Sequence, residues 1–162
     1  MILEIMTKKI FISLVFALIC AVSSAQIPAF ESFTRDRHVT YLYISGGILS
    51  MTDDVVISGL SQDADIHGII HKLDAVQIVR AEGNRQSDRT AAAVRRIIRR
   101  ERYSLFMQLN DAGSEVEIYQ GKYGDSVVIL MCVRDGPKYS AIAFSGSLTA
   151  EEIVKLARGA NH

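Results

Sequence analysis

Two histidines and an aspartate lie close together in the stretch HGIIHKLD, and their side chains are of the kinds that bind zinc. His67 and His71 are four residues apart, and Asp74 follows His71 by three. On a helix this spacing places both imidazoles on one face with the carboxylate beside them, and imidazole nitrogens and carboxylate oxygens are common zinc ligands. The three residues form a candidate metal site, which would support a metal-dependent or hydrolytic enzyme.

The same stretch has a simpler explanation as one side of an amphipathic helix. Its apolar residues repeat at helical intervals and would take the buried side, which leaves the histidines and the aspartate to solvent. Gly68 also occupies the position at which the zinc-protease motif carries its general-base glutamate. We therefore expect a solvent-exposed polar face, and the metal-dependent enzyme is the alternative. The apolar residues are Ile66, Ile69, Ile70 and Leu73.

The sequence contains no other pattern that indicates catalysis. It lacks a nucleophile elbow, a glycine-rich phosphate loop, a dinucleotide-binding fingerprint and a calcium loop. Cys132 lies within the apolar run SVVILMCV, where a thiol packs as a small hydrophobe. We predict no catalytic residues and no cofactor.

Two tyrosines form a candidate groove for a small ligand. Tyr41 and Tyr43 share one face of the predicted strand VTYLYIS, and binding pockets tend to recruit aromatic side chains. Tyrosines in such positions more often pack at the edge of a sheet. The groove is therefore the weaker of the two interpretations.

Six arginines are concentrated in the stretch RTAAAVRRIIRRER. On a helical projection Val94, Ile97 and Ile98 form an apolar stripe, and the arginines lie on or beside the opposite side. Amphipathicity alone explains their exposure, but clustered cations also create a local positive potential. We call this surface the basic face and treat it as a candidate surface for binding a partner. Its residues are Arg89, Arg95, Arg96, Arg99, Arg100 and Arg102.

Residues 1–25 have the pattern of a signal peptide. Lys8 and Lys9 precede the apolar run IFISLVFALICAV, and Ser23 and Ala25 stand at the small-residue positions that signal peptidase recognises. A run of about 13 residues is short for a membrane span, which needs roughly 20. We expect export to the periplasm or envelope, with residues 26–162 as the mature domain.

Lipid anchoring at Cys20 is a less favoured alternative, because the bulky Ile19 precedes that cysteine. After cleavage, Cys132 would be the single cysteine, so an internal disulfide is not expected and a packed core must stabilise the domain.

Charge and export together narrow the possible partners of the basic face. The chain has 18 basic and 18 acidic side chains, so the face is a local feature of a neutral protein. Export removes the protein from most nucleic acid. An envelope protein or an anionic membrane surface is the expected partner, and the sequence indicates no oligomeric state.

The elements that must position these residues alternate between helices and strands. The patterns predict a short helix over 28–37, a strand over 39–45, one or two helical turns over 48–52, and a loop over 53–65. A helix around 66–73 and a strand over 75–82 follow. A long helix is expected from Arg89, capped by Ser87 or Asp88, to about Leu109, with Ala91 and Leu109 extending its buried stripe and Leu105 within it.

Three strands and a terminal helix complete the chain. Apolar and polar residues alternate in the stretch EVEIYQGK, which predicts a strand with Glu115 and Glu117 on its solvent side. The stretch SVVILMCV is apolar throughout and predicts a central strand covered on both faces. Asp135-Gly136 predicts a hairpin turn before the third strand, YSAIAFS. Thr149 and Glu152 form a capping box at the start of the last helix.

This order predicts an α+β fold. We expect one two-layer domain, with helices packed on a mixed, mostly antiparallel sheet that ends in a three-strand meander.

Several of these segments resemble one bacterial family. TYLYIS, KLDAVQIV, RYSLFMQLND with VEIY, VVILMCV and the terminal GSLTAEEIVKLA are similar to the domain of unknown function 4252 family, over about Phe30 to Leu156. The resemblance implies a small exported or lipid-anchored envelope protein without an assigned activity. It also suggests a partner-binding role, and it supplies no catalytic residues.

Overall fold

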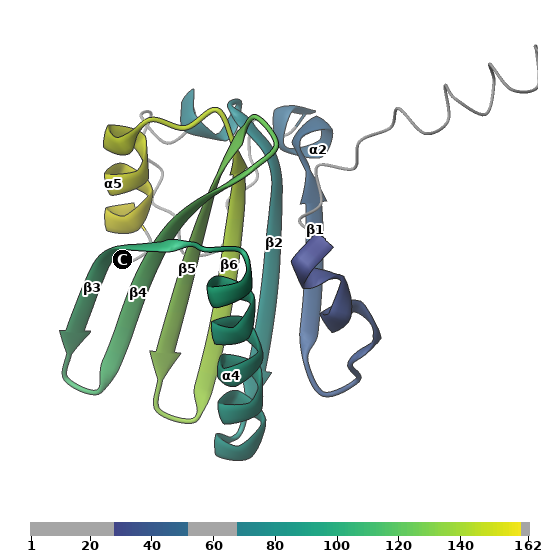
Figure 1. Cartoon of the computed structure of the whole chain (residues 1–162), viewed down its shortest axis with the longest axis vertical. Helices are drawn as coiled ribbons and strands as arrows, with labels where there is room; N and C mark the ends of the chain where they lie inside the picture. The colour runs from purple at the N-terminus through teal and green to yellow at the C-terminus, as the bar shows by residue number, and fades with distance from the viewer. Residues whose placement is uncertain (1–27, 52–67, 160–162) are drawn as a thin grey trace, which may run out of the picture.

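A computed structural model describes residues 28–51 and 68–159 of the chain. These residues form one six-stranded antiparallel sheet with helices packed on it (Figure 1). The strand order is β1-β2-β6-β5-β4-β3. The predicted signal peptide, the predicted loop over 53–65 and His67 lie outside the described residues.

The elements follow the chain in this order: η1 (Pro28–Arg35), β1 (Thr40–Ser45), α2 (Gly46–Met51), β2 (Leu73–Glu82), α4 (Asn84–Arg100), β3 (Ser104–Asp111), β4 (Ser114–Tyr123), β5 (Ser126–Asp135), β6 (Lys138–Gly146) and α5 (Ala150–Gly159).

The α+β class is confirmed as a single domain. Every strand pairing is antiparallel, and the last four strands form a meander one strand longer than expected. No helix in the described residues is long and apolar enough to cross a membrane.

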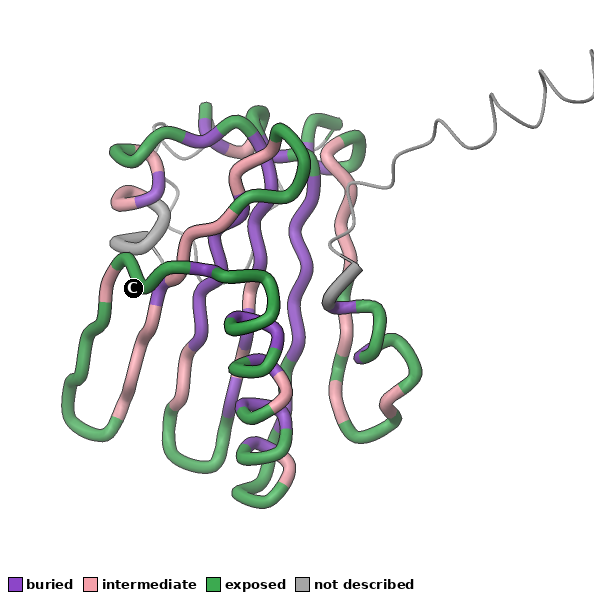
Figure 2. Tube along the Cα trace, in the orientation of Figure 1, coloured by how far each residue is buried: buried purple, intermediate pink, exposed green. Residues whose placement is uncertain are grey.

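Strand β5 is the centre of the core, as its unbroken apolar sequence predicts. Val128, Leu130 and Cys132 point to one face of the sheet, and Ile129 and Met131 point to the other. All five are buried. Figure 2 shows the buried chain concentrated in β2, β6 and β5, whereas β3 at the edge is mostly exposed. The sheet therefore has two apolar faces, and each needs a cover.

Helix α4 and η1 cover the first face. The helix contributes Val94, Ile97 and Ile98, and η1 contributes Phe30 and Phe33, whose ring centroids are 5.8 Å apart. The helix lies over β2 and β6. This packing fixes the orientation of α4 relative to the sheet.

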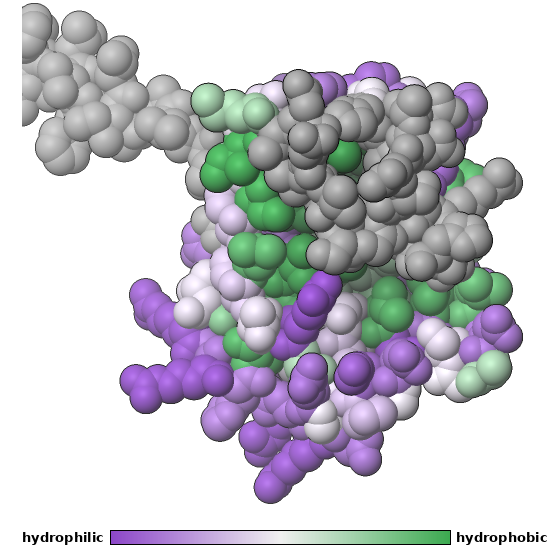
Figure 3. All heavy atoms as spheres, turned by 180° about the vertical axis from the view of Figure 1, so that it is seen from behind, coloured by the Kyte–Doolittle hydropathy of each residue, from purple (hydrophilic) through white to green (hydrophobic). Residues whose placement is uncertain are grey.

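The second face carries α5 and α2. Ile153 of α5 and Leu49 of α2 are each 1% exposed and belong to one buried cluster with Val76, Ile129 and Phe144 of the sheet. Seen from behind, apolar atoms gather on this face, with hydrophilic atoms below them (Figure 3). Helices therefore lie on both faces of the sheet rather than in one layer.

The predicted long helix is correct in its first part and wrong beyond Arg100. Arg102 has a positive φ of 57°. The amide of Tyr103 donates to Ile98 O at 3.0 Å, and that of Arg102 donates to Arg99 O at 3.3 Å. This is the hydrogen-bond pattern of a Schellman motif, which ends a helix.

Strand β3 replaces the expected end of that helix, and it pairs with β4. Leu105 and Leu109 were expected in the buried stripe, but they are 53% and 42% exposed on this edge strand. The pairing satisfies backbone groups that a helix would otherwise have used internally.

The predicted caps of α4 are also wrong. The helix begins at Asn84, and Gly83 precedes it without a side-chain cap. Ser87 is instead buried within the first turns, where its hydroxyl donates to Pro137 O at 2.7 Å and Ala81 O lies 3.2 Å away as a second acceptor for the same proton. The hydroxyl therefore joins α4 to the end of β2 and to the β5–β6 turn.

The helix expected around residues 66–73 ends at Ile70 in the described residues. His71 lies in a turn, and Leu73 and Asp74 begin β2. Leu73 belongs to a strand rather than to the expected helix because it pairs with Gly146 of β6. Ile69 and Leu73 are nevertheless buried, as expected, in the core of the second face.

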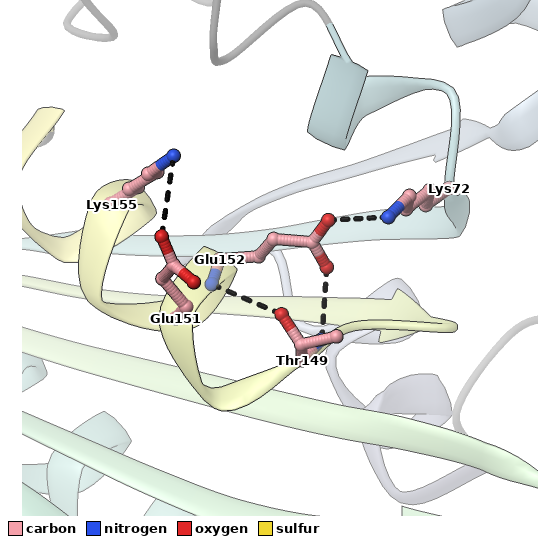
Figure 4. A network of polar contacts seen from close by, with 5 residues as sticks. All are labelled: Lys72, Thr149, Glu151, Glu152 and Lys155. Atoms are coloured by element: carbon pink, nitrogen blue, oxygen red, sulfur yellow. Dashed lines mark hydrogen bonds and ion pairs between the residues drawn. The ribbon is translucent and has the colours of Figure 1, made fainter.

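The capping box of α5 is confirmed (Figure 4). The amide of Thr149 donates to Glu152 Oε2 at 2.9 Å, and the amide of Glu152 donates to Thr149 Oγ1 at 3.4 Å. Lys72 donates to the other carboxylate oxygen of Glu152. These contacts, with that of Lys72 the largest, lower the pKa of the Glu152 carboxyl below its ordinary value.

A close contact between Gly121 of β4 and Tyr103 predicts a specific effect on stability. A Cβ at Gly121 would lie 2.0 Å from Tyr103 Cδ1, so Gly121→Ala must displace the buried ring. We expect a loss of about 1–3 kcal/mol in the free energy of unfolding, measured by urea denaturation. The loss should shrink in a Tyr103→Ala background, where no ring stands in the way.

Gly47→Ala is the matched control, because the nearest atom to a Cβ there is Ser45 Oγ at 3.9 Å. An equal effect of both substitutions would contradict the proposed packing of Tyr103.

The capping box predicts a pH dependence of stability. Because the folded-state pKa of Glu152 is lowered, its contribution is complete above the ordinary glutamate pKa of about 4.3 and is lost as the pH falls through the lowered value. Unfolding curves of the wild type and Glu152→Gln should therefore converge in acid.

Glu151→Gln is the control, since Glu151 makes only an exposed contact of 3.7 Å with Lys155. A gap between wild type and Glu152→Gln that is independent of pH would contradict the assigned role of the carboxylate.

Candidate functional site

The burial of one side of α4 places the basic face on the opposite side. Val94 is 0% exposed, and Ala91, Ile97 and Ile98 are also buried. Since helical residues repeat every 3.6 positions, this leaves the other side to solvent. All six arginines of the basic face are exposed, as the sequence predicts.

Most arginines of the basic face take no part in an ion pair among the described residues. Arg100 Nε lies 3.1 Å from Glu101 Oε1, and both side chains are exposed. Within residues 28–51 and 68–159, the other five arginines of this face form no ion pair. An exposed pair such as Arg100–Glu101 contributes little to stability. The face therefore projects positive charge into solvent.

The two flanks of α4 differ in their electrostatics. On one flank, Arg95 lines a small hollow together with Glu115 and Glu117 of β4. Both glutamates were expected on the solvent side, but the strand alternation turns them toward α4 and they are partly buried. Asp88 of the helix forms an ion pair of 2.7 Å with Arg134 of β5. Acidic and basic groups therefore alternate on this flank.

The other flank borders a larger hollow of about 370 Å³. It opens between α4 and the segment that joins η1 to β1. Arg89 and Arg96 belong to its lining, and the acidic group among its lining residues is Asp36. The residues around it are Phe33, Asp36, His38, Gln86, Arg89, Thr90, Ala92, Ala93 and Arg96.

The predicted metal site is not formed as the helical spacing suggested. His71 lies in a turn and Asp74 in β2, so they do not share a helix face. Both nevertheless line one hollow of about 640 Å³, where Ser126 Oγ donates to Asp74 Oδ2 at 2.8 Å. In the part of the chain that the structure describes, no three histidine, cysteine, aspartate or glutamate side chains could hold one metal ion.

The two tyrosines proposed as a groove lie on the edge strand β1. Tyr41 packs against the core of the first face, and its Oη accepts a hydrogen bond of 3.0 Å from Gln77 Nε2. Neither Tyr41 nor Tyr43 lines the three hollows described above. The packing role is therefore the better description of Tyr41.

Cys132 and Tyr139 are buried beneath α4. Burial raises the pKa of the Cys132 thiol to about 12, and it also raises the pKa of Tyr139. A thiol reacts as its thiolate, so Cys132 has almost none of its reactive form at neutral pH. The expectation that this cysteine packs as a hydrophobe agrees with its place in the core.

Sequence comparison places the chain in a family. The family described as a domain of unknown function (DUF4252) matches residues 33–156, and the chain belongs to it. This confirms the resemblance found in the sequence. No curated protein matches the chain, and no solved structure matches it.

The raised pKa of Cys132 predicts a chemically silent thiol. In a Cys20→Ser chain, we expect Ellman's reagent at pH 8 to leave the folded protein unlabelled over the time in which the urea-unfolded chain reacts completely. The reason is the near absence of thiolate behind the cover of α4. Labelling of the folded protein at the rate of the unfolded one would show that this face of β5 is accessible.

Proposed function

We propose that this protein is a non-catalytic accessory protein of the bacterial cell envelope, exported by the leader in residues 1–25. Its basic face would bind an acidic surface of a partner protein. The observation that carries the proposal is the exposed, largely unpaired set of arginines along α4. The signal-peptide pattern supports the location, because Lys8, Lys9 and the apolar run precede small residues at the cleavage position.

The arrangement of the charges favours a role in recognition. Five cations on one side of α4, with Arg102 just beyond its end, create a positive local potential on a protein whose total charge is balanced. Such a potential speeds the encounter with an acidic partner and disfavours basic ones. Arginine also pairs with carboxylates through two parallel hydrogen bonds, so acidic side chains are suitable partners.

A protein partner fits α4 better than a membrane surface. A helix that binds at the membrane interface buries its apolar side in lipid, but the apolar side of α4 is packed on the sheet. The large exposed apolar residues of the described chain lie on other elements. They are Leu42, Ile48, Met51, Leu105, Phe106, Leu109 and Tyr123.

Charge reversal on the basic face tests the proposal. The Arg96→Glu, Arg100→Glu double variant should bind poly-glutamate about tenfold or more weakly than the wild type at low ionic strength, because attraction becomes repulsion. Fluorescence anisotropy measures the binding, and its salt dependence should be reduced in the variant. The fold should persist, since both side chains are exposed.

The matched control is Lys122→Glu, Lys138→Glu, which changes the net charge equally. Both lysines are exposed. Tyr119 of β4 and Tyr139 of β6 pack on the side of α4, and strand alternation therefore turns Lys122 and Lys138 to the other side. Equal losses in the two double variants would mean that net charge alone matters, and the basic face would then be no contact surface.

A further inference from the structure

The hollow beside α4 exists because the helix presents small side chains there. Ala92 and Ala93 line it, with the aromatic ring of Phe33 opposite on η1. The segment after η1 carries Asp36 and His38 past the helix, and the amide of His38 donates to Asp36 Oδ1 at 2.9 Å. This hydrogen bond stabilises the turn that forms the wall of the hollow across from α4. The space is therefore a product of two elements whose packing is fixed by the core.

Two arginines of the basic face stand at this hollow. Arg89 and Arg96 are seven residues apart, which is about two turns and about 10 Å along the axis. Both are exposed, and neither forms an ion pair within the described residues. Gln86, one turn before Arg89, adds an amide that can donate and accept.

Thr90 adds a polar group that the fold leaves unsatisfied. It lines the hollow and is 2% exposed. Its hydroxyl is the one buried side-chain group without a hydrogen-bond partner among the described residues. A buried hydroxyl without a partner costs free energy, and a ligand that reaches it after rotation about the Cα–Cβ bond would recover part of that cost.

We propose that this hollow binds a single carboxylate, carried by a glutamate or aspartate side chain of the partner protein. The inference rests on the proposed function, and it identifies the group that is recognised. Arg89 and Arg96 supply the donors, and the apolar wall of Phe33, Ala92 and Ala93 contacts the methylene groups of the incoming side chain.

The charge of the hollow favours a carboxylate over a phosphate. The negative charge of Asp36 offsets one of the two arginines, so these three side chains together carry one net positive charge. One carboxylate balances that charge, whereas a phosphate dianion would exceed it and would approach Asp36. The concave shape further favours a projecting side chain over a flat lipid surface.

Filling the hollow without changing any charge tests this inference. Ala93→Leu adds an apolar side chain that occupies the space, and leucine is a good helix former. Calorimetric titration with a capped Gly-Glu-Gly peptide should show binding to the wild type and about tenfold weaker binding to Ala93→Leu. A capped Gly-Gln-Gly peptide should bind the wild type as weakly as that variant binds the acidic peptide.

The controls separate this inference from the proposed function. Ala93→Leu should bind poly-glutamate nearly as well as the wild type, because the arginines remain. Ala150→Leu, which adds the same side chain at the exposed start of α5, should leave peptide binding unchanged. Thr90→Val should weaken peptide binding without lowering the melting temperature, since it removes a hydroxyl that has no partner.

Several results would overturn the inference while the proposed function stands. Equal binding of the Glu and Gln peptides would exclude recognition of the carboxylate. Unchanged peptide binding by Ala93→Leu would place the site elsewhere on the basic face. Stronger competition by inorganic phosphate than by acetate would assign the hollow to phosphate, and loss of binding to phosphatidylglycerol vesicles in Ala93→Leu would assign it to lipid.

Discussion

The packing of the apolar side of α4 against the sheet determines what the rest of the surface can do. Val94, Ile97 and Ile98 are buried in the core of the first face. A helix cannot rotate about its axis without removing these side chains from the core, so the arginines opposite them are held in solvent. The same packing covers Cys132 and Tyr139.

Both ends of α4 are fixed by hydrogen bonds and backbone conformation rather than by charge. At the start, the Ser87 hydroxyl lies within hydrogen-bond distance of Ala81 O and Pro137 O and joins the helix to the end of β2 and to the β5–β6 turn. At the end, the left-handed Arg102 reverses the chain into β3. Tyr103 then lies over Gly121 and closes the core at that corner.

The parts of the fold that sequence predicted are those with local signals. The capping box of Thr149 and Glu152 needs only four consecutive residues, and the continuous apolar run of β5 needs only its own composition. The end of α4 could not be predicted from a glycine. Arg102 takes the left-handed conformation that a glycine usually adopts at the end of a helix. Leu105 and Leu109 fit both a helix and a strand, and pairing with the following strand β4, which the segment's own periodicity does not show, decides between them.

In the candidate site, too, the features with a local sequence signal were predictable and the others were not. The exposure of the arginines follows from helical period and was predicted, whereas the hollow depends on where Phe33, Asp36 and His38 meet the helix. No sequence pattern in residues 33–38 or in α4 indicates that these two segments pack side by side. The alternative metal site assumed one helix through His71 and Asp74, but β2 begins at Leu73, so these two residues line a common hollow by way of a turn. The chain belongs to a family described as a domain of unknown function. The exposed arginines of α4 are the feature whose binding can be tested.

Chemical-shift mapping by NMR tests the central claim most directly, with isotope-labelled protein titrated with an acidic polypeptide. We expect the perturbed amides to cluster on α4 between residues 86 and 100 and in the segment 36–38 that faces it. Perturbations centred on His71 and Asp74, or spread evenly over the molecule, would contradict it.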